Sequence, residues 1–183
     1  MTGWLALFVL LLAAANPATG ARTNRTGETR ALAAGIAAAM VAIGLVSAAA
    51  GAESLLDAFE IEQETARIAA GLVLAMTGGQ AIVLGGPLVR DIPRDWQRGI
   101  YPLGIPLAVN PALVACAVAF AAHPDAGAAR AATLATSAGL ATAAVALLLP
   151  PRLNAFADAL ARLTGGLAVL LAAAMVVSGV RDV

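Results

Sequence analysis

Long apolar runs with almost no charged residues constrain this chain more than any other feature. Residues 31–51 read ALAAGIAAAMVAIGLVSAAAG, without a single charged side chain. A transmembrane helix needs about 20 mostly apolar residues to cross the hydrocarbon core of a bilayer. Only 12% of the chain is charged, whereas soluble domains carry about 25%. We therefore expect an integral membrane protein whose first partner is the lipid bilayer.

Six segments are long and apolar enough to be interpreted as membrane spans. They cover about residues 4–20, 31–51, 66–89, 100–122, 128–149 and 159–180. The first, WLALFVLLLAAANPATGA, has the apolar core of a secretory signal but lacks its positively charged start, so we expect it to be retained as a helix. The acidic stretch between the second and third spans is interpreted as a connection. The prediction is one all-α membrane domain over residues 1–183 with six transmembrane helices.

One dipeptide interrupts two of these spans in similar settings. It is Asn16-Pro17 within LLLAAANPATG and Asn110-Pro111 within IPLAVNPALVA. Proline has no backbone N–H to donate, and it disfavours helical dihedrals in the residue before it. We therefore expect discontinuous first and fourth helices, the fourth also interrupted by the two prolines of YPLGIPLAV. Each Asn side chain would either hydrogen-bond a polar solute or only cap the helix that its proline breaks.

The second half of the chain echoes the first. The two Asn-Pro dipeptides are 94 residues apart, and Arg67 in ARIAAGLVLAM is 95 residues from Arg162 in ARLTGGLAVLL. Each half, about 1–89 and about 100–183, would hold three spans, with a cytoplasmic loop joining the halves. An odd number of spans inserts the halves in opposite orientations, which is the 3+3 inverted repeat common among secondary transporters. In that plan the broken helices meet near the midplane, where helix ends offer N–H groups to an anion and C=O groups to a cation.

The arginines orient the predicted spans, because basic residues gather on the cytoplasmic side of a membrane. Eight lie in or beside the loops after the first, third and fifth spans, and three lie on the opposite side. The eight are Arg22, Arg25, Arg30, Arg90, Arg94, Arg98, Arg152 and Arg162, and the three are Arg67, Arg130 and Arg181. We expect a multi-pass protein of the cell membrane with both termini outside the cytoplasm. Arg67 and Arg162 would either gate a path or clamp a carboxylate, or only reach the lipid headgroups.

Four stretches of the chain resemble the MarC-type family of six-span membrane proteins, also described as neutral amino acid transporters. They are LFVLLLAAANPATG, FEIEQETARIAAGLVLAM, YPLGIPLAVNPALVA and ARLTGGLAVLLAAAMVVSGV, in the family's order and in both halves. The chain departs from the family where Asn110-Pro111-Ala112 replaces a common Gly-Pro-Gly. It also turns polar directly after the first helix, so it looks like a divergent member with a shortened first loop. The resemblance implies uptake or export of small neutral amino acids such as alanine or glycine.

The polar content of the spans narrows the chemistry. No Asp, Glu, Lys or His lies inside a predicted span, so the titratable group that proton-coupled transporters place there is missing. With one His and one Cys in the chain, we expect no metal, no cofactor and no nucleophile paired with a base, and we predict that the protein is not an enzyme. A net charge of zero gives no support to nucleic-acid binding.

We therefore predict alternating-access transport of a small zwitterionic amino acid. The predicted substrate-binding residues are Asn16, Pro17, Asn110 and Pro111, together with Gln80 and Gly71. Gln80 is costly to bury without a polar partner, whereas Gly71 would let either a solute or a neighbouring helix approach closely. Two alternatives remain open at this point. One is a membrane structural or accessory protein that transports nothing, and the other is a transporter of an ion or another small metabolite.

Overall fold

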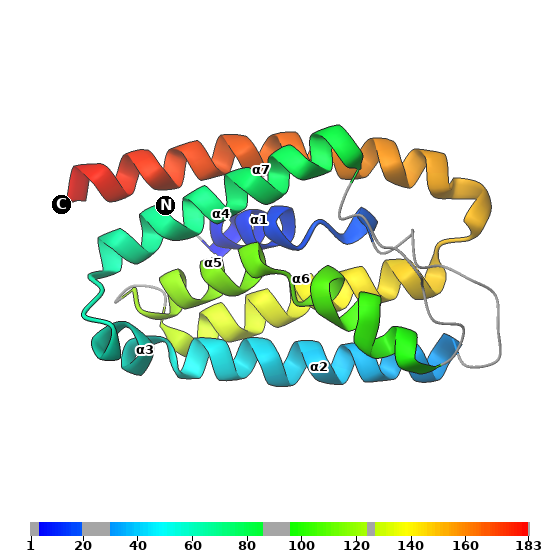
Figure 1. The fold of residues 1–183 in the computed structure, drawn as a ribbon, viewed down its shortest axis with the longest axis horizontal. Helices are drawn as coiled ribbons and strands as arrows, with labels where there is room; N and C mark the ends of the chain where they lie inside the picture. Colours follow the sequence, from blue (N-terminus) through cyan, green and yellow to red (C-terminus); the bar gives the residue numbers. More distant parts are fainter. Residues whose placement is uncertain (1–3, 20–29, 86–95, 124–126, 183) are drawn as a thin grey trace.

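The computed structural model describes residues 4–19, 30–85, 96–123 and 127–182, and every regular element in these ranges is a helix. In chain order the elements are α1 (Trp4–Ala15), α2 (Arg30–Ala50), α3 (Ala52–Ala58), α4 (Gln63–Leu84), η2 (Trp96–Gly99), η3 (Ile100–Ala108), α5 (Pro111–Ala121), α6 (Ala128–Leu148), η4 (Pro151–Leu153) and α7 (Asn154–Asp182). The long helices run roughly parallel to one axis in a single bundle (Figure 1). The predicted all-α class is confirmed.

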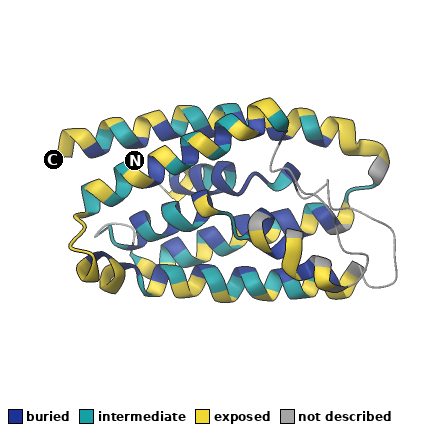
Figure 2. Ribbon diagram, in the orientation of Figure 1, coloured by how far each residue is buried: buried dark blue, intermediate teal, exposed yellow. Residues whose placement is uncertain are grey.

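Among the described residues, three helices are long and apolar enough to cross a membrane. They are Ala31–Ala50, Gln63–Leu84 and Asn154–Asp182. Large apolar side chains cover their outer faces, among them Leu72 and Met76 of α4 and Leu170 of α7, all of them exposed. Figure 2 shows yellow, exposed positions recurring along the outer faces of α2, α4 and α7. Apolar surface of this extent is compatible with lipid contact.

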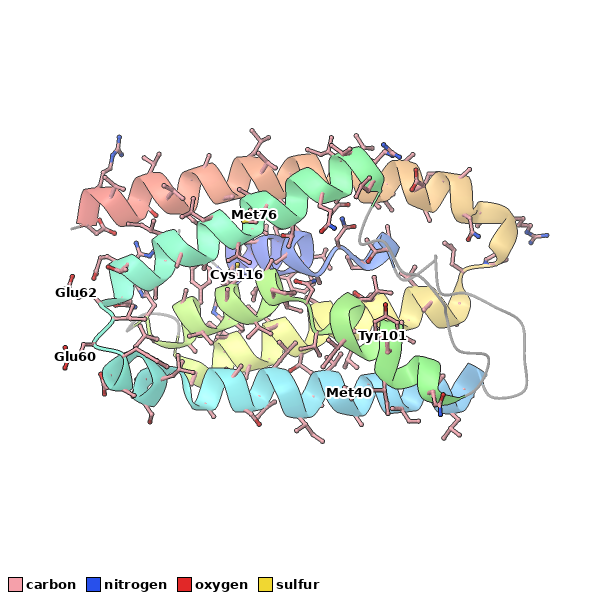
Figure 3. The ribbon with its side chains drawn as sticks, viewed as in Figure 1. Met40, Glu60, Glu62, Met76, Tyr101 and Cys116 are labelled. Atoms are coloured by element: carbon pink, nitrogen blue, oxygen red, sulfur yellow. The ribbon has the colours of Figure 1, made fainter. Side chains whose placement is uncertain are left out.

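The short helices α1 and α5 lie in the middle of the bundle. Leu11 of α1 and Leu113 and Cys116 of α5 are fully buried. The pair α4 and α7 covers one side of this centre, and the pair α2 and α6 covers the other (Figure 1). Figure 3 places Cys116 inside the bundle, and it shows Glu60 and Glu62 at the end beside α3, pointing away from it. The two broken segments therefore meet inside the protein.

A seam of small residues joins α4 and α7. A Cβ atom on Gly78 would lie 2.8 Å from the carbonyl oxygen of Gly165, and a Cβ on Gly165 would lie 2.7 Å from that of Gly78. Further along, a Cβ on Gly71 would lie 3.1 Å from the carbonyl oxygen of Ala172, so the two helices run antiparallel. Only glycine fits at such separations. Small residues at an interface are the usual means by which membrane helices approach closely.

An arginine lies at each end of this seam. Arg67 near the start of α4 donates a hydrogen bond of 2.6 Å to Asp182 at the end of α7. Arg162 of α7 donates to the carbonyl oxygens of Ile82 and Val83 at 2.8 and 3.1 Å. These carbonyls belong to the last turn of α4, where the helix dipole favours a cation. At both ends, an arginine of one helix holds the C-terminal end of the other.

The structure corrects several predicted boundaries. α4 ends at Leu84 instead of reaching about residue 89, because Gly85 adopts φ 71°, the left-handed conformation that terminates helices. α7 begins at Asn154 rather than near residue 159, and an ion pair of 3.0 Å between Asp158 and Arg162, one turn apart, supports its start. The acidic connection contains the short helix α3, which forms because its apolar face, with Ala52 and Leu56, is buried.

The predicted fourth span is interrupted where its prolines indicate. Tyr101 and Ile105, which precede Pro102 and Pro106, have φ/ψ of −128°/129° and −124°/127°. A following proline forces such extended dihedrals on the residue before it. η3 is therefore an irregular helical segment, and regular α-helix resumes only at Pro111.

Some predictions concern residues outside the described ranges. Among them are the loop arginines Arg22, Arg25, Arg90 and Arg94 and the connection over 86–95 between the two halves. Within the described ranges, the start of α2 and the ends of α4 and α6 lie at one end of the bundle. Helix α3 and the end of α7 lie at the other (Figure 1).

Candidate functional site

The second Asn-Pro dipeptide begins α5 in the middle of the bundle. Asn110 has φ −92° and ψ 156°, and its Oδ1 accepts the N–H of Leu113 at 2.8 Å. This is N-cap geometry, in which a side chain satisfies a free N–H of the first helical turn. Its Nδ2 donates to the carbonyl oxygen of Ala14 at 2.9 Å and reaches that of Ala15 at 3.4 Å. Both ends of the amide are engaged, and the side chain ties the start of α5 to the end of α1.

The first dipeptide follows the end of α1 and is built differently. Asn16 has φ 45°, a left-handed conformation that Asn tolerates better than most residues. Its Nδ2 donates to the carbonyl oxygen of Ala161 on α7 at 3.0 Å. That bond fixes the orientation of the amide, because a flipped amide would place oxygen against oxygen. The Oδ1 of Asn16 is buried without a hydrogen-bond partner in the described part of the chain, at a typical cost of about 1–3 kcal/mol.

The first proline also releases a backbone carbonyl. A helical carbonyl normally accepts the N–H four residues further along, and proline has none. Ala13 stands four residues before Pro17, so its carbonyl lacks that donor. Each dipeptide thus brings one amide side chain to the cavity, and the first also brings a carbonyl without a helical donor.

These elements enclose a cavity of about 210 Å³. Its walls are the end of α1 with the first break, the second break, and the α4–α7 seam. The lining comprises residues 13–16 and Thr19, then Thr77, Gly78, Gln80 and Ala81 of α4, and from the second half Leu107, Asn110, Pro111 and Gly165. Sites for drug-sized ligands measure about 300–1,000 Å³. A cavity of this size suits a smaller solute.

Four of the six predicted site residues line this cavity together. They are Asn16, Asn110, Pro111 and Gln80. Asn16 is only 8% exposed, whereas Gln80 and Pro111 are exposed. The cavity therefore has a buried wall at the first break and reaches the surface between α4 and α5.

The two remaining predicted residues are placed differently. Pro17 does not line the cavity and acts through the N–H that it lacks, which leaves the Ala13 carbonyl without a helical donor. Gly71 lies in the α4–α7 seam, where an added Cβ would be 2.9 Å from Val176 Cγ2. Of the two interpretations that the sequence left open for Gly71, close helix packing describes its place.

Sequence reasoning missed several lining residues. Thr19 donates its hydroxyl to the carbonyl oxygen of Asn16 at 2.8 Å and so stabilises the turn after the break. The sequence indicates this role, because Thr19 stands three residues after the Asn in the motif ANPATG. Gly165 could not be found from the repeat, because the offset of 95 residues pairs Gly71 with Gly166, around which the structure leaves open space.

The lining carries amides, hydroxyls and backbone groups but no ionisable side chain. Among the residues that the structure describes, no group of three His, Cys, Asp or Glu side chains could hold a metal ion. A solute with a net charge would find no counter-charge here, and an uncompensated buried charge is costly. A zwitterion carries its own counter-charge. Comparisons with protein-family models, with curated proteins and with solved structures find no match to this chain, so the chemistry of the cavity carries the functional inference.

Proposed function

We propose that this protein is a membrane transporter that moves a small zwitterionic amino acid, such as alanine or glycine, by alternating access. The observation that carries the proposal is the uncharged cavity in which Asn16 of the first half and Asn110 of the second half both take part. Transporters built from two repeats bind their substrates where the broken helices of the repeats meet. The resemblance of four stretches to the MarC-type family points to the same class of solute.

The proposed architecture is six spans arranged as a 3+3 inverted repeat. The helices that would correspond in the two halves contact one another: α2 contacts α6, α4 contacts α7, and α1 contacts α5. Arg67 and Arg162, which correspond in the repeat, hold opposite ends of the antiparallel α4–α7 pair. A two-fold axis in the membrane plane would generate this pairing, with one broken helix from each half at the centre.

The chemistry of two helix ends supports a zwitterionic solute. The last residues of α1 and the first residue of α5 line the same cavity. The C-terminal end of a helix carries partial negative charge, and the N-terminal end carries partial positive charge. An ammonium group would be favoured beside α1, and a carboxylate nearer to Gln80, whose side-chain amide can donate to it. In alternating access, relative movement of the two halves would open this cavity to each side of the membrane in turn.

Counterflow in proteoliposomes tests this function. Vesicles that contain the protein and are preloaded with unlabelled alanine should accumulate labelled alanine. The Asn16→Ala, Asn110→Ala double variant should lose at least about 90% of that flux, because it removes the unpartnered Asn16 Oδ1 and the bond by which Asn110 holds the start of α5 to the end of α1, each worth roughly 1 kcal/mol. Thr77→Val is the matched control. Thr77 is a lining residue, but its hydroxyl donates to the carbonyls of Val73 and Leu74 in its own helix, so the flux of this variant should be unchanged. No flux of any amino acid across a panel would contradict the transport proposal.

A further inference from the structure

The donor groups of the cavity are almost all engaged within the protein. The Nδ2 of Asn16 donates to Ala161 and that of Asn110 donates to Ala14. The hydroxyl of Thr19 donates to the Asn16 carbonyl, and the hydroxyl of Thr77 is bonded to its own helix. Of the polar side chains in the lining, only Gln80, on the exposed side, has a donor for which the structure gives no acceptor.

The start of α5 is a poor anion site for the same reason. A helix N-terminus binds anions through its free N–H groups. Here Pro111 has none, and the N–H of Leu113 is already accepted by the Oδ1 of Asn110. This N-terminus retains little capacity for a carboxylate.

Acceptor oxygens, in contrast, remain available at the buried wall. The Oδ1 of Asn16 is buried without a partner, and the bond from its Nδ2 to Ala161 fixes which end of the amide it is. The carbonyl of Ala13, which is a cavity residue, lacks a helical donor because Pro17 stands four residues further along. The C-terminal end of α1, with its partial negative charge, lies beside them. The buried wall of the cavity is therefore rich in acceptors.

We propose that this wall is a binding site for a small cationic group, held by the Asn16 Oδ1 and the carbonyl oxygen of Ala13. The group is the ammonium of the solute, which donates its N–H groups to these oxygen atoms. The inference deepens the proposed function and rests on it for the identity of the solute. It adds that the amino end of the solute, and not its carboxylate, is what the buried wall recognises.

This site predicts a specific order of ligand affinities. Glycine and alanine should bind best, because the ammonium meets the acceptors and the carboxylate balances the charge. Methylamine, with an ammonium but no carboxylate, should bind more weakly. Lactate replaces the ammonium of alanine with a hydroxyl, and betaine has a positive nitrogen without any N–H, so neither should bind.

Binding can be measured apart from transport through the single cysteine. Cys116 is free and fully buried, so its labelling by a maleimide dye during heating reports unfolding of the purified full-length protein. A ligand that binds only the folded state delays this labelling. The delay should follow the order above, and NaCl titrated against choline chloride separates Na⁺ from the ammonium as the occupant. In Asn16→Gly, which keeps the left-handed backbone, the apparent Kd of the effective ligand should be weaker by about tenfold or more, because one charge-assisted hydrogen bond is removed. In Thr133→Val, which changes a hydroxyl that lies outside the cavity and donates to Ala129 in its own helix, it should not change.

Each outcome bears on the proposal. A delay by glycine and methylamine that Asn16→Gly weakens supports the ammonium site, whereas a delay by NaCl alone would overturn it. Equal responses to alanine, lactate and betaine, or no response to any amine, would overturn it as well. Alanine counterflow with lactate and betaine as equal competitors would overturn this inference and leave the transport function standing. If ligands delay Cys116 labelling in the order above but no amino acid shows flux, the transport function is overturned and the ammonium site stands.

Discussion

The two Asn-Pro breaks have the same sequence but different chemistry. At the second break, Asn110 caps α5 and donates to the end of α1, so both ends of its amide are used. At the first break, Asn16 takes a left-handed φ of 45° and anchors its Nδ2 on α7, and its Oδ1 has no partner in the described structure. The second break is a structural joint between the halves. The first leaves a buried acceptor without a partner at the wall of the cavity.

A broken helix therefore does not by itself make a binding site. Both breaks bring an asparagine to the cavity, but only the first leaves a side-chain acceptor without a partner among the described residues. We therefore expect stability to depend mainly on Asn110 and ligand binding mainly on Asn16. Substitutions can separate the two roles.

The largest loss of stability should come from the seam that supports the first break. In Gly165→Val, the new side chain would meet the Gly78 carbonyl oxygen at 2.7 Å and the Cβ of Ala81 at 2.8 Å, so α4 and α7 must separate. Overpacking of this kind costs about 1–3 kcal/mol. Asn16 is bonded to Ala161 on the same helix, one turn before Gly165, so the cavity should deform there first. Thermal unfolding in detergent, followed by Cys116 labelling, measures the loss.

Gly166→Ala is the control for that substitution. An added Cβ at Gly166 meets nothing within 4 Å, and alanine is favoured over glycine in a helix by about 0.5–1 kcal/mol. The control should unfold at the same temperature as the native chain or higher. Equal destabilisation by both changes would show that α4 and α7 are not in close contact.

Asn110→Ala should have the next largest effect on stability. It removes the N-cap of α5 and the bond to Ala14, and N-cap losses typically cost about 0.5–2 kcal/mol. Asn110→Ser keeps a good capping residue but is too short for the bridge to α1, so it should lie between the native chain and Asn110→Ala. The midpoint of thermal unfolding of the three proteins orders them. If Asn110→Ser equals Asn110→Ala, the cap contributes nothing.

The smallest effect on stability should come from Asn16→Gly. The substitution loses the bond to Ala161, and interhelical bonds in membranes average about 0.6 kcal/mol. It also removes a buried acceptor without a partner and relieves the left-handed backbone, which offset that loss. Asn16→Ala keeps the strain and should be less stable than Asn16→Gly by about 1 kcal/mol. Comparable thermal midpoints for these two variants would contradict the left-handed conformation of residue 16.

Much of the helical plan could be predicted from the sequence, because its signals are local. A proline sets the dihedrals of the residue before it, so Tyr101 and Ile105 depart from the helix where the prolines of YPLGIPLAV indicate. Apolar length places α2 and α6 within a few residues. The predicted end of α4 is wrong because the prediction includes the Gly-Gly-Pro sequence in the helix, whereas Gly85 already terminates it.

The polarity of the cavity could not be predicted, because it depends on contacts between distant segments. Asn16 and Ala161 are 145 residues apart, and Asn110 and Ala14 are 96 residues apart. From the sequence, the two asparagines are predicted to be equivalent. Only the partners that each amide finds in the fold distinguish the engaged Asn110 from the available Asn16.

The most direct test of the proposed binding site between the two Asn-Pro breaks is an experimental structure of the full chain in lipid with saturating alanine. We predict density for the solute in the cavity between Asn16 and Asn110, with its amino group within hydrogen-bond distance of the Asn16 Oδ1. Density at another place, or continuous helices through residues 16 and 110, would contradict it.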